Sequence, residues 1–363
     1  MHYLILCGLV LITAMGYDLV KRNYKNSESV QIFLVAAIIF MLSLFAGLRR
    51  QYNDTYAYVD GFIKTGEEFP ELFKGEFKLS NTFIFPIWTW FIKNIIADDV
   101  TVYLFLCSIV FVGPSVYLMH KYSKDLTFSL VLFLFGGPYL FSFGAVRQMM
   151  AAGIVLMAVP ALLKKKYVTY YVFFLIAFFM HTYSLFLVVL PILGLELFNK
   201  RTIVFMIAAI IVGLGLSLFT GLMTEVIAWF GEDISEDRLT EDYTINILRF
   251  IVYWIPSILM IISKREVQEG VSDGEKVMMK MSLLSSGFIT LALFGNPVLF
   301  GRLPYFFYVG TMVSLPYVVQ KAFQKNTQRP IYVIAAILYT LYGFYDLYNA
   351  SAFTGNRFGL IWF

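Results

Sequence analysis

The sequence has little charge and few of the residues that build soluble active sites. Only 14% of its 363 residues are charged, and it contains two cysteines and three histidines. A surface with so few charges would not keep a chain of this length in solution. A soluble enzyme, a disordered scaffold and a secreted disulfide module are therefore excluded.

The rare residues do not form a metal or redox framework. Cys7 and Cys107 lie inside apolar runs, so we expect buried thiols and no disulfide. The histidines, His2, His120 and His181, are scattered and cannot assemble a zinc site. There is no Walker A loop, no GxGxxG after a strand and no HExxH. We expect no metal, no cofactor and no nucleic-acid partner.

Apolar residues are abundant, at 59% of the chain. They occur in runs near the length of about 20 residues that crosses roughly 30 Å of hydrocarbon. This pattern predicts an all-α, polytopic integral membrane protein with a single transmembrane domain over residues 1–363. The runs lie at 3–19, 30–48, 82–97, 100–119, 126–142, 146–163, 167–180, 183–198, 202–220, 246–263, 277–294, 303–320 and 330–347.

Clusters of basic residues separate some of these runs and should share the cytoplasmic face, because short loops rich in Lys and Arg stay inside. That condition requires residues 82–97 to be a re-entrant or interfacial segment on the outer side. It also requires 167–198 to be a hairpin that turns near His181. About twelve crossings result, with loops 49–81 and 221–245 outside. The clusters are Lys21/Arg22/Lys25, Lys121/Lys124, Lys164/Lys165/Lys166, Lys200/Arg201, Lys264/Arg265/Lys276/Lys280 and Lys321/Lys325/Arg329.

Arginine is enriched on the predicted outer side. Of the 28 basic residues, the clusters hold 17, of which 13 are Lys, whereas 7 of the other 11 are Arg. Topology signals do not require Arg over Lys, but bidentate binding of a phosphate or carboxylate does. The seven outer arginines are Arg49, Arg50, Arg147, Arg238, Arg249, Arg302 and Arg357.

Several polar residues occupy predicted N-terminal ends of helices on this side. Arg147 and Gln148 follow a Gly-Gly-Pro break, and Arg302 stands just before Pro304, which suits a first helical turn. His181 stands at the turn of the predicted hairpin. Helix N-termini carry partial positive charge and free N–H groups. These positions therefore favour an anionic ligand.

Simpler interpretations stay open for each residue. An arginine at a helix end can reach lipid head groups. His181 can act only as a polar residue in a turn, where Thr182 and Ser184 are further capping candidates. Asp54 can be solvated or paired with one of the two arginines that precede it, Arg49 and Arg50.

Three segments resemble the sequence blocks of the EpsG/Wzy-type bacterial polysaccharide polymerases. They are RRQYNDTYAYVDGF, the stretch that begins VRQMMAAGIVLMAVPALL and continues through AFFMHTYSLF, and GRLPYFFYVG. The first resembles the family signature "R…GtDtxxY", with Asn53 in place of the usual Gly. Asn also tolerates a left-handed backbone, so the turn should be retained.

The resemblance implies a GT-C-like glycosyltransferase that polymerises undecaprenyl-pyrophosphate-linked oligosaccharide repeat units. It would act on the outer face of the bacterial cytoplasmic membrane, with a flippase and a chain-length regulator as candidate partners. The growing chain would move from its lipid pyrophosphate onto the incoming unit, without a metal or a nucleotide.

The resemblance also suggests roles for particular residues. Arg147 and Arg302 would stabilise the leaving pyrophosphate, with Arg49 or Arg50 as a third contact. His181 or Asp54 would accept or orient the proton of the attacking hydroxyl. The remaining candidates for substrate binding are Gln148, Tyr56 and Tyr58.

Two other functions are compatible with a polytopic membrane protein. A lipid-linked oligosaccharide flippase or another transporter would place ionisable residues near the membrane midplane, often within inverted repeats. A membrane acyltransferase would use His181 as its base and need a route for an acyl donor from the cytoplasm. The special residues here lie at one face and no half of the chain is duplicated, so the polymerase is favoured.

Overall fold

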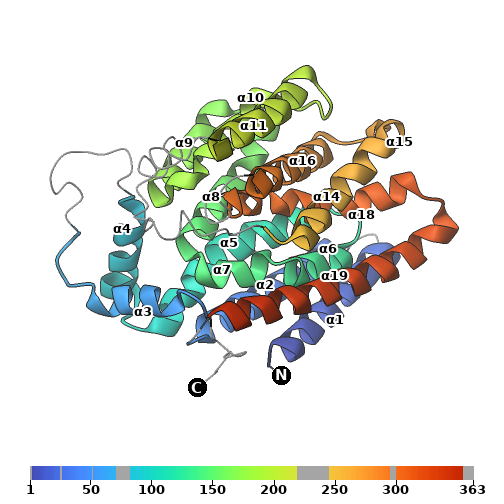
Figure 1. Cartoon of the computed structure of the whole chain (residues 1–363). Coiled ribbons are helices and arrows are strands. Elements are labelled where there is room, and N and C mark those ends of the chain that lie inside the picture. The colour runs from blue at the N-terminus through green and yellow to red at the C-terminus, as the bar shows by residue number, and fades with distance from the viewer. Residues whose placement is uncertain are drawn as a thin grey trace.

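The computed structural model describes residues 2–24, 27–50, 52–70, 82–218, 245–294 and 300–354, and the regular secondary structure in these residues is helical throughout. Figure 1 shows them packed into one bundle. The first half contains α1 (His2–Asn23), α2 (Glu28–Leu48), α3 (Thr55–Lys64), α4 (Ile84–Phe91), η1 (Ile92–Ile96), α5 (Val100–Tyr122), α6 (Leu126–Phe135), α7 (Pro138–Gly144) and α8 (Val146–Leu163). The second half contains α9 (Tyr167–Met180), η2 (Thr182–Val188), α10 (Val189–Leu193), α11 (Lys200–Leu218), α14 (Ile247–Ile262), α15 (Lys264–Gln268), α16 (Asp273–Phe294), η3 (Leu303–Phe306), α18 (Tyr308–Ala322) and α19 (Lys325–Thr354).

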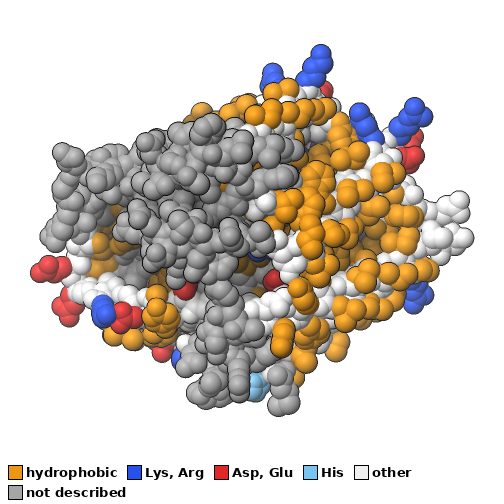
Figure 2. All heavy atoms as spheres, viewed as in Figure 1, with side chains coloured by type: hydrophobic (Ala, Val, Ile, Leu, Met, Phe, Trp, Pro, Cys, Tyr) orange, Lys and Arg blue, Asp and Glu red, His pale blue; other side chains and the backbone are white. Residues whose placement is uncertain are grey.

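The chain is an all-α, multi-pass membrane protein. Among the described residues, six helices are long and apolar enough to cross a membrane, namely α1, α2, α5, α8, α16 and α19. The pair α6 and α7, bent by 42°, would make a seventh. Figure 2 shows hydrophobic side chains covering much of the described surface, with Lys and Arg gathered toward one end.

This number is smaller than the predicted twelve because several apolar runs form short or broken helices. Glycine and proline interrupt the run at 126–142, where Gly137 adopts a φ of +103° and α7 begins at Pro138. The run at 183–198 forms a 3-10 helix followed by five residues of α-helix. Hydropathy predicts which residues are buried in lipid or protein, but it does not predict whether one continuous helix extends through the run.

The helix α5 packs between α2 and α8 at close range. A Cβ atom at Gly153 of α8 would collide with the backbone of Val110 and Phe111, and one at Gly47 of α2 would lie 2.9 Å from Thr101 O. Small residues of this kind let membrane helices approach closely where van der Waals packing drives association. The bundle therefore fixes the ends of α2, α5 and α8 relative to one another.

Direct contacts connect five of the six basic clusters at one end of the bundle. Arg22 pairs with Asp125 at 3.2 Å, and Lys124 pairs with Glu275 at 2.5 Å. Three further contacts involve the other clusters: Lys280 Nζ donates to Leu193 O at 3.1 Å, Arg201 to Ile192 O at 3.3 Å and Lys321 to Glu269 O at 2.7 Å. We call this the basic end. These five clusters lie at one end, as the sequence predicts for all six.

The segment 82–97 lies at the opposite end and is too short to cross. Its helices α4 and η1 have 8 and 5 residues, or about 20 Å at 1.5 Å per residue. Lys93 Nζ donates to Ile63 O at 2.6 Å and Trp90 Nε1 to Glu67 O at 2.8 Å, which keeps the segment beside α3. Of the two long loops expected outside, residues 71–81 and 219–244 lie outside the described part of the chain.

Single-cysteine labelling tests this arrangement. With Cys7 and Cys107 replaced by Ala, Lys64→Cys and Asp98→Cys should react equally with an impermeant maleimide on intact cells, because both residues are exposed and flank the segment that does not cross. Lys165→Cys, between α8 and α9, should react only after the membrane is opened. Labelling of Lys64→Cys without Asp98→Cys would show that residues 82–97 cross the membrane.

Candidate active site

Three segments that are distant in the sequence meet at the end of the bundle opposite the basic end. The side-chain amide of Gln148, in the first turn of α8, donates to the carbonyl oxygen of Arg302 at 2.8 Å. The charges of Arg147 and Arg302 both act on the ring of His181. The structure thus brings together four predicted site residues, Arg147, Gln148, His181 and Arg302.

His181 is held at the turn of a hairpin. It ends α9 with an extended backbone (φ −158°, ψ 120°), and its Nδ1 atom accepts a hydrogen bond from Tyr183 N at 3.2 Å. The hairpin is closed further along, where the Tyr170 hydroxyl donates to Leu187 O at 2.7 Å. The His181 ring itself therefore caps η2, a role for which the sequence also suggested Thr182 and Ser184.

The surroundings of His181 keep its ring neutral. Burial, together with the positive charges of Arg147 and Arg302, lowers the pKa of His181 to about 3. Because Nδ1 accepts a hydrogen bond, the proton of the neutral ring must lie on Nε2. The Nε2–H group can therefore donate a hydrogen bond to a ligand.

Arg147 is exposed, and its guanidinium lies 5.8 Å from the centre of the Phe85 ring. The Tyr58 hydroxyl interacts with both the side chain and the backbone N–H of Arg147. Burial raises the pKa of Tyr58, and these interactions with Arg147 partly offset the rise. Tyr56, by contrast, is 71% exposed. The structure therefore places Tyr58, one of the predicted substrate contacts, beside Arg147, whereas the side chain of Tyr56 is largely exposed.

Arg302 precedes a 3-10 helix, η3, in which Pro304 occupies the first turn as the sequence suggests. Two side chains hold the backbone around it. Gln148 binds the carbonyl of Arg302, and the Arg249 guanidinium of α14 donates to the carbonyl of Gly301 at 3.1 Å. The Arg302 side chain itself is partly exposed.

Arg249 is a residue whose place in this site the sequence did not reveal. Its guanidinium lies 5.1 Å from the Tyr305 ring and 5.7 Å from the Tyr253 ring. The carboxylate of Asp346, in α19, is close enough for the two charges to interact. The only signal in the sequence is its membership of the outer arginines, since no motif surrounds it.

Arg49 and Arg50, predicted as further substrate contacts, have partners within the protein. Arg49 is 1% exposed and donates to Thr55 Oγ1 at 3.1 Å, to Phe143 O at 3.3 Å and to Ala46 O. Arg50 is exposed and donates to Thr101 Oγ1 at 2.9 Å. Arg49 therefore joins the end of α2 to α3 and α7, and its guanidinium offers almost no surface to a ligand.

Asp54 is exposed at the start of α3, and its side chain makes no capping hydrogen bond there. Within the described part of the chain, it forms no ion pair with Arg49 or Arg50, so that simpler interpretation is not supported. Its charge does act on Tyr58, which places it on the Arg147 side of the site. The preceding Asn53 has a φ of +45°, which confirms the expected left-handed turn.

The described residues contain no group of three or more His, Cys, Asp or Glu side chains placed to hold a metal ion.

The protonation of His181 can be measured directly. With labelled histidine, the imidazole signals of His181, assigned by their loss in His181→Gln, should not move between pH 5 and pH 8. A group with a pKa near 3 stays neutral throughout this range. A titration with a midpoint near 6.5, the ordinary value for histidine, would contradict the electrostatic environment described here.

The sequence model of the EpsG family matches residues 32–358. No curated protein and no solved structure matches the chain. The match covers most of the sequence and includes all four residues that converge at the site. The chain therefore belongs to the EpsG family, the family of Wzy/EpsG-type polysaccharide polymerases.

Proposed function

We propose that this protein is a membrane glycosyltransferase that joins undecaprenyl-pyrophosphate-linked oligosaccharide repeat units into a polysaccharide. The observation that carries the proposal is the placement of Arg147 and Arg302 around His181, at one end of a membrane bundle. Two neighbouring guanidinium groups suit a pyrophosphate, because each can bind phosphate oxygens in a two-pronged geometry. Membership of the EpsG family supports the same substrate class.

The reaction transfers the growing glycan from its lipid pyrophosphate to a hydroxyl of the incoming unit. The bond between the anomeric carbon and the phosphate oxygen breaks, and the acceptor oxygen bonds to that carbon. Lipid pyrophosphate leaves with an additional negative charge. Arg147 and Arg302 stabilise this charge as it develops, and such electrostatic preorganisation accounts for large rate enhancements in enzymes.

His181 and Asp54 divide the remaining roles. A ring with a pKa of about 3 and its proton on Nε2 is a weak base but a good hydrogen-bond donor. In the proposed mechanism His181 donates to a phosphate or sugar oxygen. The exposed carboxylate of Asp54 accepts the proton of the attacking hydroxyl, and Tyr58 and Gln148 contact the substrate.

The proposal also includes an architecture, a cellular location and two partner proteins. It places the transmembrane helices in a GT-C-like arrangement, in the bacterial cytoplasmic membrane, with the site on the outer face. The basic end supports this orientation, because clusters of Lys and Arg favour the cytoplasm. A flippase would deliver the substrate and a chain-length regulator would limit the product.

Substitution of the two arginines by lysine tests the pyrophosphate assignment. Arg147→Lys and Arg302→Lys keep the charge but lose the planar two-pronged donor geometry, so each should reduce polymer formation by roughly 10- to 100-fold. The measurement is polymer produced per inserted protein. Arg265→Lys, an exposed change at the basic end, is the matched control. Polymer at the control level in both site variants would show that the assignment is wrong.

Single-turnover assays with a lipid-pyrophosphate repeat unit test the role of His181. His181→Ala should lose polymerisation, and His181→Gln should keep a small part of it, because an amide N–H can replace the donor. Asp54→Asn should be damaging, since an amide accepts no proton. Full activity in His181→Ala would leave His181 as a structural cap only, and full activity in Asp54→Asn would remove the carboxylate from the mechanism.

A further inference from the structure

A groove of about 870 Å³ lies at the basic end, far from the candidate active site. It runs between α1, α6 and α19. One wall is apolar and is formed by Leu11, Met15, Val131, Val333 and Ala336. Its mouth is cationic and is formed by Arg22, Lys124, Lys325 and Arg329. The volume is within the range of about 300–1,000 Å³ that is typical of ligand sites.

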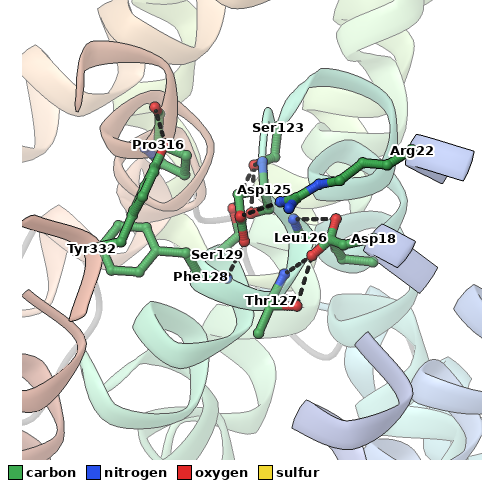
Figure 3. A network of polar contacts seen from close by, with 10 residues as sticks. All are labelled: Asp18, Arg22, Ser123, Asp125, Leu126, Thr127, Phe128, Ser129, Pro316 and Tyr332. Carbon is green, nitrogen blue, oxygen red and sulfur yellow. Dashed lines mark hydrogen bonds and ion pairs between the residues drawn. The ribbon is translucent and has the colours of Figure 1, made fainter. Parts of the chain in front are cut away.

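The two acidic residues that line the groove, Asp18 and Asp125, both have partners within the protein (Figure 3). Asp18 accepts hydrogen bonds from Leu126 N at 3.2 Å and from the backbone and hydroxyl of Thr127 at 2.9 and 2.6 Å. Asp125 caps α6 through Phe128 N at 2.8 Å and pairs with Arg22 at 3.2 Å. These contacts hold α1 against the start of α6, so both carboxylates serve to fix the groove.

Two of the cations that line the groove belong to α19. Lys325 and Arg329 are exposed and four residues apart in the first turns of this helix, and neither forms an ion pair with the described residues. Positive charges at a helix N-terminus oppose the helix dipole, and like charges four residues apart repel each other. An anion between them would relieve both effects.

The floor of the groove is an aromatic surface. The ring of Tyr332, in α19, lies edge to face with Phe128 at a centroid distance of 5.0 Å. Its hydroxyl donates to Pro316 O at 2.8 Å, as Figure 3 shows. The aromatic side chains are thus fixed by contacts within the protein, and both line the groove.

We propose that this groove binds an anionic glycerophospholipid. Its head-group phosphate lies between Lys325 and Arg329, and one acyl chain follows the apolar wall past Met15 and Leu11. A cationic mouth above an apolar slot between helices matches the two chemical parts of such a lipid, and basic pockets between transmembrane helices are known to bind anionic head groups. Under the predicted topology the lipid comes from the cytoplasmic leaflet.

Native mass spectrometry of the full chain tests this site. The protein is released from nanodiscs that contain equal amounts of phosphatidylglycerol and phosphatidylcholine, and bound lipids are counted. We expect one retained phosphatidylglycerol, bound roughly thirty-fold more weakly in Lys325→Gln/Arg329→Gln, since two basic contacts are lost. Lys264→Gln/Arg265→Gln removes two charges from the same end outside the groove and should retain the lipid.

A second variant tests the apolar wall. Val333→Trp fills the slot but keeps both charges, and it should also weaken phosphatidylglycerol binding. Equal retention of phosphatidylcholine, or unchanged binding in both Lys325→Gln/Arg329→Gln and Val333→Trp, would overturn the proposal. So would glycerol 3-phosphate that competes as tightly as the lipid, because the site would then recognise phosphate alone. None of these measurements depends on polymerase activity.

Discussion

Hydrogen bonds to two successive carbonyl groups, those of Gly301 and Arg302, fix the backbone at Arg302, the second arginine of the candidate site. Gln148 holds one carbonyl from α8 and Arg249 holds the other from α14. The helix η3 that follows has only four residues, so it cannot fix this backbone by its own hydrogen bonds. A neutral hydrogen bond contributes about 1 kcal/mol and one from a charged group about 1.5–3 kcal/mol. Arg249 therefore dominates this attachment, and the nearby Asp346 and Tyr305 position Arg249 in turn.

The electrostatics of the site follow from that attachment. Arg147 and Arg302 share one neighbour, His181, and their charges combine with burial to keep its ring neutral. Two cations at the end of an apolar bundle repel each other and attract an anion, and the attraction increases as the anion gains charge. Catalysis requires interactions that strengthen in the transition state. A leaving pyrophosphate provides such an interaction, whereas a neutral sugar bound at the same place would not.

Sequence alone predicts the membrane class, the shared end of the basic clusters and the convergence of Arg147, Gln148, His181 and Arg302. These features depend on hydropathy, charge and helix ends, which are local properties. Tyr56 and Tyr58 are both candidates for substrate binding in the sequence, but they lie on one helix, α3, which begins at Thr55. Residues two apart on a helix point in different directions, and only Tyr58 reaches Arg147.

Other features depend on tertiary contacts that no local pattern records. In the sequence Arg49 resembles the other outer arginines, but in the fold its guanidinium is buried and donates to Thr55 and Phe143. Arg249 reaches the site only because α14 packs beside residue 301. The number of crossings was overestimated relative to the long helices found, because glycine and proline divide apolar runs into pieces. Hydropathy predicts which segments are buried in the membrane or core, and packing decides how many are continuous helices.

The central claim is that a lipid pyrophosphate binds between Arg147 and Arg302. A structure of the protein with undecaprenyl pyrophosphate, the leaving product, tests it most directly. Phosphate oxygens should lie about 2.7–3.2 Å from both guanidinium groups, with one oxygen in reach of His181 Nε2. A pyrophosphate bound elsewhere, with Arg147 and Arg302 both pointing into lipid head groups, would contradict the claim.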